Sequence, residues 1–329
     1  MKVLITGSTG FVGRYLVAEL LGRGVGCRLL VRDVVAAEKI FENAGNIEFW
    51  PGDITKPETL KSIADGVDYV YHLAAAGHVS AMSQAAFDEF VRVNVEGTKD
   101  LVQECKGFGV KKFVHFSSTA AMGLIKKDVV DESTTPEPRS PYQKSKLQSE
   151  TAALDAGGDD VPVVVVRPCM IYGPGGKGEF YKICNLMRKG RFPKVGFGKN
   201  LTPLVHVTDV VRAAMKAAEK GLGGEVYLVA SETSIDLNYM RKLVMQAWGT
   251  KAMYPYVPVW LMLLVGWVFE ILALVTNTPP MCTRKNIAST VFNRVFSIEK
   301  AKTQLGYVPE ITFEQGIAET VDWFRSLQC

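Results

Sequence analysis

Seven short runs of apolar residues recur along the chain, and longer helical patterns separate them. The runs are rich in valine, isoleucine and leucine and lack polar alternation; they cover residues 2–6, 27–31, 47–50, 68–73, 111–117, 161–167 and 225–229. Strands of this kind belong to a parallel sheet that helices cover on both faces. Because strands and helices alternate with short connections, the pattern predicts an α/β fold with a doubly wound parallel sheet.

The last hundred residues have a different pattern. Helical periodicity dominates there, over residues 237–249, 297–307 and 312–327, with proline-containing turns between. A chain of 329 residues can bury the cores of two modest domains. We therefore expect a sheet domain formed by residues 1–174 and 206–232. A smaller, mainly helical C-terminal substrate lobe would be formed by residues 175–205 and 233–329.

The charge and the cysteine content of the chain limit the partners and the cellular environment that we expect. The formal net charge is only +4, and no basic run is interleaved with aromatic residues, so we expect no nucleic-acid partner. The six cysteines are scattered without the spacing of a metal site, which predicts no metal and a reducing, cytoplasmic environment. The chain begins directly with a strand and a glycine turn, so we expect no signal peptide.

A glycine-rich turn follows the first apolar run. In "ITGSTGFVG" (5–13), Gly7, Gly10 and Gly13 lie between a predicted strand and a predicted helix. Glycines at these places allow a tight turn and a close approach of the backbone to a pyrophosphate at the helix N-terminus. The context predicts a Rossmann-type dinucleotide-binding domain. Contacts would come from Gly7, Thr9, Gly10, Phe11, Val12 and Gly13.

The end of the second strand bears on the choice between NADP and NAD. Many NAD sites place an acidic residue there, but this chain has Val31 followed by Arg32. An arginine suits the additional 2′-phosphate of NADP, so we expect NADP. Asp33 keeps NAD open, should the strand register shift by two residues. Asp53, in "PGDIT", is expected near the adenine.

Tyr142 and Lys146, in "YQKSK", are spaced four residues apart and share one face of a predicted helix. An ammonium near a phenol favours the phenolate and lowers its pKa from about 10, which suits a general acid or base. On this motif alone, a partly buried tyrosine beside a solvated lysine is the commoner explanation.

Eight sequence motifs, taken together, decide between a catalytic and a merely structural role for Tyr142 and Lys146. The chain contains "TGSTGFVG", "GDI", "HLAA", "NVEGT", "FSST", "YQKSK", "RPCMIYGPG" and "PLVHVTDVVRA". Over nearly its whole length it resembles the extended short-chain dehydrogenase/reductase family, within the NAD-dependent epimerase/dehydratase superfamily.

The resemblance implies roles for particular residues. Tyr142 would move the proton, Lys146 would hold the nicotinamide ribose and lower the tyrosine pKa, and Ser118 would hydrogen-bond the reacting oxygen. Further cofactor contacts are implied for Asp53, Ile54, Leu73, Ala74, Ala75, Asn94 and Arg167. His206 and Asp209 match a motif that usually supports the hinge between the lobes.

Three departures from the nucleotide-sugar members favour another branch of the family. Cys169 and Met170 stand where those members usually carry an asparagine, Thr202 stands in place of an arginine, and Val31 stands in place of an acid. A diphosphate would lose charge-assisted hydrogen bonds here. The closest character is therefore hydroxysteroid dehydrogenase-like or dihydroflavonol reductase-like, with a hydrophobic ketone or alcohol as substrate.

Two other functions are compatible with the sequence. A different basic clamp is available from Lys177, Lys182, Arg188 and Lys194, so a nucleotide-sugar epimerase or dehydratase with tightly bound NAD is the alternative. A cofactor-binding protein without turnover is a third, although the intact set of Ser118, Tyr142 and Lys146 argues against it.

The segment 254–280 is strongly apolar, with Glu270 as its one charge. It could form a wall of a hydrophobic pocket or make a peripheral membrane contact through residues 257–275. A true span is disfavoured, because the segment is short and interrupted. The resemblance also implies a homodimer through the helix that holds Tyr142 and the helical pattern around 90–105.

Overall fold

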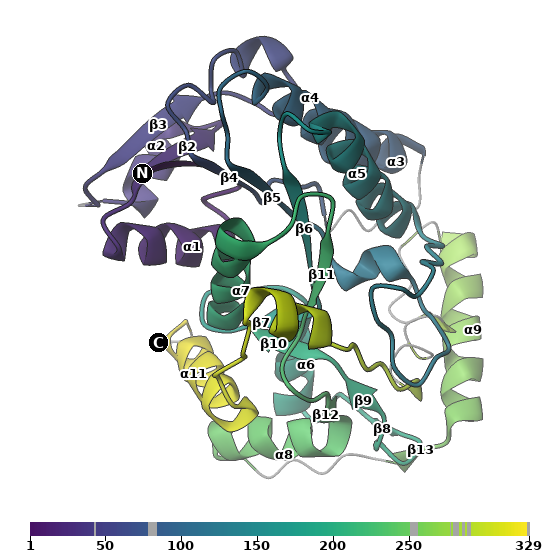
Figure 1. Cartoon of the computed structure of the whole chain (residues 1–329). Helices are drawn as coiled ribbons and strands as arrows, with labels where there is room; N and C mark the ends of the chain where they lie inside the picture. Colours follow the sequence, from purple (N-terminus) through teal and green to yellow (C-terminus); the bar gives the residue numbers. More distant parts are fainter. Residues whose placement is uncertain are drawn as a thin grey trace.

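The sheet is parallel throughout. In the computed structural model, which describes residues 1–42, 44–77, 84–250, 256–276, 278, 283–284, 287 and 291–327, seven strands pair in the order β3-β2-β1-β4-β5-β6-β11 (Figure 1). All seven predicted runs form these strands: β1 (Lys2–Thr6), β2 (Gly26–Val31), β3 (Ile47–Pro51), β4 (Tyr69–His72), β5 (Lys112–Phe116), β6 (Val163–Pro168) and β11 (Val226–Val229). The doubly wound fold is therefore confirmed.

Helices cover both faces of the sheet. One face carries α1 (Phe11–Gly22) and α7 (Val207–Lys220); Figure 1 shows α4 (Gly97–Glu104) and α5 (Pro141–Gly157) on the other. Shorter helical segments connect the strands: α2 (Val34–Ile40), Pro57–Thr59, α3 (Gln84–Phe90), the π-helical Val91–Glu96, and Thr119–Met122.

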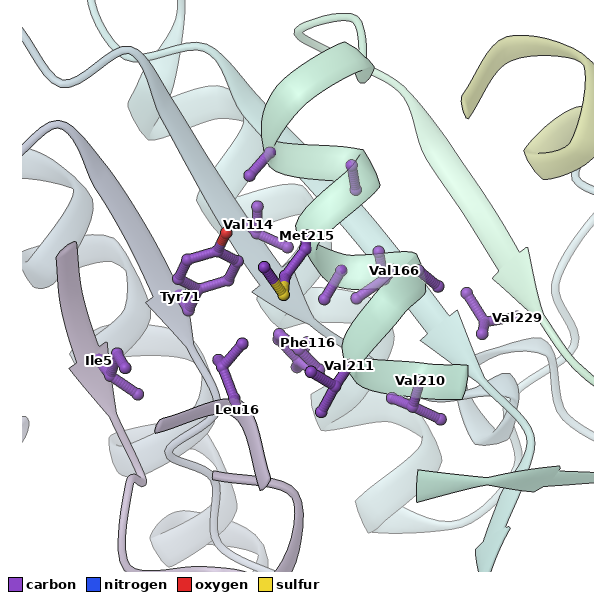
Figure 2. Packing of buried hydrophobic residues seen from close by; sticks show 14 of the residues in the cluster. Ile5, Leu16, Tyr71, Val114, Phe116, Val166, Val210, Val211, Met215 and Val229 are labelled. Atoms are coloured by element: carbon purple, nitrogen blue, oxygen red, sulfur yellow. The ribbon is translucent and has the colours of Figure 1, made fainter. Parts of the chain in front are cut away.

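Side chains alternate between two cores, as the pleat of a strand requires. In β1, Ile5 packs on the side of α1 and α7, whereas Leu4 belongs to the core under α4 and α5. Figure 2 shows the first core, where side chains of α1 and α7 meet the strands through Ile5, Leu16, Tyr71, Val114, Phe116, Val166, Val210, Val211, Met215 and Val229. Such burial on both faces explains why the strand sequences lack polar alternation.

A smaller lobe has its own core. Its buried side chains come mainly from α6 (Glu179–Arg188), α8 (Leu237–Trp248) and α11 (Phe313–Ser326). At the boundary with the sheet domain, β7 (Met170–Tyr172) pairs with β10 (Leu204–His206). Two further short pairs lie within the lobe: β9 (Leu201–Thr202) with β12 (Ile235–Asp236), and β8 (Lys194–Val195) with β13 (Tyr256–Val257). Helix α9 (Val259–Thr276) stands at the periphery (Figure 1).

One C-terminal segment packs with the sheet domain. Ile298, Ala301, Leu305 and Tyr307 are buried in the same core as α7, and the Tyr307 hydroxyl donates to the Ala230 carbonyl at 3.0 Å. The π-helical Ala301–Leu305 thus lies on the sheet rather than beside α8 and α11. The division into two lobes stays a prediction, and this segment departs from it because its apolar side chains fit the gap beside α7.

Candidate active site

The glycine loop lies where the strand order reverses, at the carboxyl ends of β1 and β4. Gly7 has φ +69°, and a Cβ there would lie 2.7 Å from the Ala74 nitrogen and 2.8 Å from the Leu73 carbonyl carbon. The Ala74 N–H also donates to the Thr6 hydroxyl at 3.1 Å. In doubly wound sheets this crevice is where ligands bind, so the glycine loop and the chain after β4 form one candidate wall.

Helix α1 starts tightly against this loop. The Gly10 N–H donates to the Gly7 carbonyl at 3.0 Å, and a Cβ on Gly13 would lie 2.3 Å from the same oxygen. The Ser8 hydroxyl is buried without a partner among the described residues. Free backbone N–H groups at a helix N-terminus suit a pyrophosphate. The residues present therefore fit a dinucleotide.

The other predicted loop residues line the same turn. Thr9 is exposed, and Phe11 and Val12 are half-buried. A Cβ on Gly176 would lie 2.8 Å from the Phe11 ring, and the Tyr15 hydroxyl donates to the Pro174 carbonyl at 2.9 Å. The turn at 173–176, where the chain enters the second lobe, is thus fastened to the start of α1.

The end of β2 now has a defined geometry. Val31 is buried, Arg32 is exposed, and the Asp33 carboxylate caps α2 by accepting from the Ala36 N–H at 2.9 Å. Asp33 therefore has a structural use, whereas Arg32 extends from the strand end.

Asp53 lies close enough to Arg32 to be influenced by its charge. Burial alone would raise the pKa of Asp53, but hydrogen bonds from Thr55 and the charges of Arg32 and Lys56 lower it. Ile54 points away from this edge: its side chain is buried and would meet a Cβ on Gly97 at 2.9 Å.

Tyr142 and Lys146 lie on one face of α5, as the spacing predicts. Ser140 and Gln143 form a capping box, which fixes the first turn of the helix just before Tyr142. The Tyr142 ring packs edge-on against Phe90, with ring centroids 5.7 Å apart, and lies 3.8 Å from where a Gly77 Cβ would be. The Tyr142 ring thus packs between Phe90 and the segment that follows β4.

Lys146 and Ser118 both lie near the carboxyl end of β5. The buried Lys146 ammonium donates to the Phe116 carbonyl at 2.8 Å, and Ser118 follows two residues later. The Ser118 oxygen accepts from the Ala120 N–H at 3.1 Å, which holds the hydroxyl at the start of a helical turn. The three proposed catalytic residues are thus positioned by β5 and by the first turns of α5.

The pKa of Tyr142 differs from the sequence-based expectation. Burial raises the pKa of Tyr142 above its usual value rather than lowering it. Burial also lowers the pKa of Lys146 to about 8, while Glu150 acts in the opposite direction. The expectation of a lowered tyrosine pKa is wrong for this structure, because loss of water disfavours the phenolate and the ammonium bonds to the Phe116 carbonyl.

Asn94 connects the segment after β4 with helix α5. Its side-chain oxygen accepts from the Ala76 N–H at 2.7 Å, and its amide nitrogen donates to the Ala76 carbonyl and to the Ser145 hydroxyl, each at 3.1 Å. Asn94 therefore holds the segment after β4 against α5. Ala75, which precedes Ala76, is exposed.

Two buried histidines lie beneath Lys146. His72 and His115 stack with ring centroids 5.4 Å apart. Burial and the Lys146 charge lower the pKa of His72 to about 3 and hold the pKa of His115 well below its usual value. Both rings are neutral in the physiological range, so Lys146 and not a histidine carries the positive charge here.

A buried ion pair that the sequence did not reveal lies under the site. Arg167 donates from Nε and Nη2 to the Glu150 carboxylate at 2.9 and 2.5 Å, and the Ser117 hydroxyl donates to the same carboxylate. The guanidinium is thus already occupied, which favours a supporting role for Arg167 over a direct cofactor contact. One signal was available: Glu150 follows Lys146 by four residues on the same helix face.

Replacing Glu150 with alanine should be strongly destabilising. The Arg167 guanidinium would be left buried without its counter-charge, a change that typically costs about 3–5 kcal/mol. Urea unfolding of Glu150→Ala would measure the loss. Glu137→Ala, which removes an exposed partner of Arg139, is the control and should change the unfolding free energy little. Equal effects of the two substitutions would contradict this account.

A small pocket is formed by residues that follow Ser118 in the chain and by two residues near position 295. It is lined by Met122, Gly123, Ile125, Lys127, Val130, Arg294 and Phe296. Most of this lining is apolar. The Arg294 Nε is buried and has no partner among the described residues, and burial lowers the pKa of this side chain.

Fold and site together define a nucleotide-dependent oxidoreductase class. The profile of the NAD dependent epimerase/dehydratase family matches residues 3–230. The chain belongs to this family, whose members are the extended short-chain dehydrogenases/reductases, and it is an NAD(P)-dependent enzyme.

Three relatives show the range of substrates. A farnesyl-dihydroquinoline-oxide ketoreductase from Stigmatella aurantiaca is 30% identical, covering 96% of this chain and 95% of the relative. The mouse decarboxylating sterol-4-alpha-carboxylate 3-dehydrogenase is 27% identical over 99% and 92%. The dTDP-glucose 4,6-dehydratase of Streptomyces antibioticus is 30% identical over 99% and 92%.

A solved structure agrees with the fold. UDP-glucuronic acid 4-epimerase from Bacillus cereus, in complex with NAD, superposes with a TM-score of 0.80 at 22% identity, covering 100% of both chains. Across the described ranges, this chain has no helix with the length and apolar character needed to cross a membrane.

Proposed function

We propose that this enzyme interconverts a ketone and a secondary alcohol on a hydrophobic, sterol- or flavonol-like substrate, with NADP as the preferred cofactor. The observation that supports the proposal is the hydrogen bond from the Lys146 ammonium to the Phe116 carbonyl, because it holds the helix that carries Tyr142 and Lys146 against the strand end that leads to Ser118. The farnesylated substrate named for one relative and the sterol named for another support the hydrophobic substrate.

The residues divide the chemistry between them. When bound, the nicotinamide supplies or accepts the hydride at the reacting carbon. Tyr142 donates or accepts the proton on the substrate oxygen, and its raised pKa keeps the hydroxyl protonated for donation near neutral pH. Ser118 hydrogen-bonds that same oxygen. Lys146 would hold the nicotinamide ribose through its buried ammonium, which donates to the Phe116 carbonyl in this structure.

The proposal extends to the surroundings of the enzyme. We place it in the cytoplasm, as a homodimer through α5 and the helices over residues 90–105. It would touch a membrane peripherally through residues 257–275. Helices α4 and α5 pack against each other on the outer face of the sheet domain (Figure 1), which makes this pair available to a second copy.

One observation favours a second candidate, a nucleotide-sugar epimerase or dehydratase with tightly held NAD. Arg294 places a half-buried guanidinium in the pocket, and its charge influences Cys169 just after β6. A buried cation with a free N–H suits an anionic group on a substrate. The dehydratase relative supports this alternative.

The test is a calorimetric titration of the purified protein with NADP and NAD, after a check for retained cofactor. We expect reversible binding with a preference for NADP. In Arg32→Gln, NADP affinity should fall about tenfold to a hundredfold while NAD affinity stays nearly constant, since one charge-assisted contact is typically worth about 1.5–3 kcal/mol.

Arg23→Gln serves as the control, because Arg23 is an exposed arginine paired with Glu19 at the far end of α1. Retained NAD that does not exchange would support the epimerase alternative. An unchanged ratio of the two affinities in Arg32→Gln would reject the role of Arg32.

A further inference from the structure

Helix α9 turns its apolar side away from the protein. Its exposed positions are Trp260, Leu261, Leu264, Trp267, Val268, Ile271 and Leu272, with Trp260 67% exposed. The spacing i, i+1, i+4, i+7, i+8, i+11 and i+12 describes one continuous face of a helix. A surface helix normally presents polar residues to water, so the polarity of α9 is inverted. We call these seven residues the α9 stripe.

The opposite side of α9 holds the helix to the chain. Gly266 is buried, and a Cβ there would lie 2.7 Å from Ile287 Cδ1 and 3.0 Å from the Arg284 nitrogen. Glu270 accepts from the Arg284 backbone N–H at 2.8 Å and pairs with its side chain at 2.7 Å. The one acidic residue of α9 is therefore neutralised on the attached side, and the α9 stripe carries no charge.

A basic, aromatic loop lies beside the start of α9. β8 pairs with β13 immediately before the helix, and a Cβ on Gly196 would lie 3.1 Å from Val259 Cγ2. The next residue, Phe197, is 80% exposed. Residues 191–199 include Arg191, Lys194 and Lys199 and contain no acidic residue. Apolar and positively charged groups thus share this end of the molecule.

We propose that the α9 stripe and Phe197 dock on the surface of an anionic lipid bilayer, with α9 lying in the plane of the membrane. The inference deepens the proposed function, because it names the surface that makes the peripheral contact. Helices of this kind sink about 5–10 Å into the boundary between headgroups and acyl chains. Tryptophans favour that boundary, and lysines near it are attracted to anionic headgroups.

The size of the α9 stripe argues against a second copy as its occupant. An 18-residue helix is about 27 Å long. A single stripe about 10 Å wide then covers roughly 300 Å², well below the about 800 Å² per partner of a standard interface. A bilayer needs no matching surface, and its negative charge complements the lysines beside Phe197.

The docking surface is connected to the pocket near Ser118. A Cβ on Gly196 would also lie 3.9 Å from Val291, and Lys126 lies over the Phe292 ring at 5.5 Å. The Val130 N–H donates to the Val295 carbonyl at 2.9 Å, which ties the pocket-lining loop to the same segment. Packing and one backbone hydrogen bond thus join the segment beside α9 to the loop that lines the pocket.

Vesicle co-sedimentation of the full chain tests the proposal. We expect the protein to sediment with vesicles of phosphatidylcholine and phosphatidylglycerol and less with phosphatidylcholine alone. Leu264→Glu/Val268→Glu should lower the affinity for the anionic vesicles at least tenfold, because both positions lie in the centre of the α9 stripe. Lys199→Glu should mainly reduce the preference for the anionic vesicles. All five tryptophans are retained, so their fluorescence shift on vesicle addition gives a second readout.

The matched control is Leu222→Glu/Val308→Glu, which adds the same charge at two exposed apolar positions outside α9. It should bind like the wild type. The proposal is overturned if the wild type stays in the supernatant with anionic vesicles or if Leu264→Glu/Val268→Glu binds unchanged. A wild-type dimer that this variant converts to a monomer, without lipid binding, would assign the α9 stripe to a second copy and also overturn it.

The two proposals can fail separately. Vesicle binding requires no turnover, so binding without any ketone reduction would reject the proposed function and retain the docking surface. Ketone reduction by a protein that does not bind vesicles would reject the docking surface and support the proposed function.

Discussion

Tyr142→Phe should lower the turnover number by about a hundredfold to ten-thousandfold, the range expected when a positioned acid or base is lost. The Tyr142 phenol is the group that we propose to move the proton. Phenylalanine keeps the edge-on packing against Phe90, and the hydroxyl makes no hydrogen bond to another described residue. We therefore expect unchanged thermal unfolding and nearly unchanged cofactor affinity.

Steady-state kinetics and calorimetry on the same preparation separate chemistry from binding. Tyr69→Phe is the control. This half-buried tyrosine lies at the amino end of β4, away from the carboxyl ends of the strands, and its hydroxyl makes no hydrogen bond to another described residue. It should retain full activity. Activity of Tyr142→Phe near the wild-type value would show that another group moves the proton.

Gly13→Ala should disrupt the cofactor cradle and the protein together. The new Cβ would lie 2.3 Å from the Gly7 carbonyl oxygen and 2.7 Å from Ser8 Cα, both backbone atoms that no rotamer change can move. Forcing extra volume into such packing typically costs about 1–3 kcal/mol or more. The displaced N–H groups should also weaken cofactor binding by more than about tenfold.

Urea unfolding with and without cofactor measures both effects. Gly22→Ala, in the last turn of the same helix, is the matched control because nothing lies within 4 Å of its added Cβ. Alanine there should be neutral or stabilising by up to about 1 kcal/mol. If Gly13→Ala bound cofactor as the wild type does, the cradle would have to lie elsewhere.

Local signals were sufficient to predict the sheet and the glycine turn at its first strand. Apolar runs without alternation report strands buried on both faces, and glycines between a strand and a helix report a turn that side chains cannot enter. The i, i+4 spacing of Tyr142 and Lys146 likewise follows from helix geometry alone. Each of these features depends on neighbours within a few residues, so the sequence contains the information directly.

The pKa values of the site residues and their contacts with distant parts of the chain depended on the tertiary structure. The raised pKa of Tyr142 results from burial beside Phe90, which is 52 positions away in the chain. The ion pair of Glu150 and Arg167 joins a helix and a strand whose register no local pattern reports. Asp33, a candidate NAD ligand by spacing, proved to be a helix cap.

Helix α9 shows the same division most clearly. The sequence by itself determined that the segment 254–280 is strongly apolar, as it determined the sheet, the glycine loop and the family resemblance. A helix that is apolar nearly all round gives no periodic signal for which side faces inward. Only the tertiary structure decided this, because Gly266 and the Glu270–Arg284 pair attach one side and leave the tryptophans exposed.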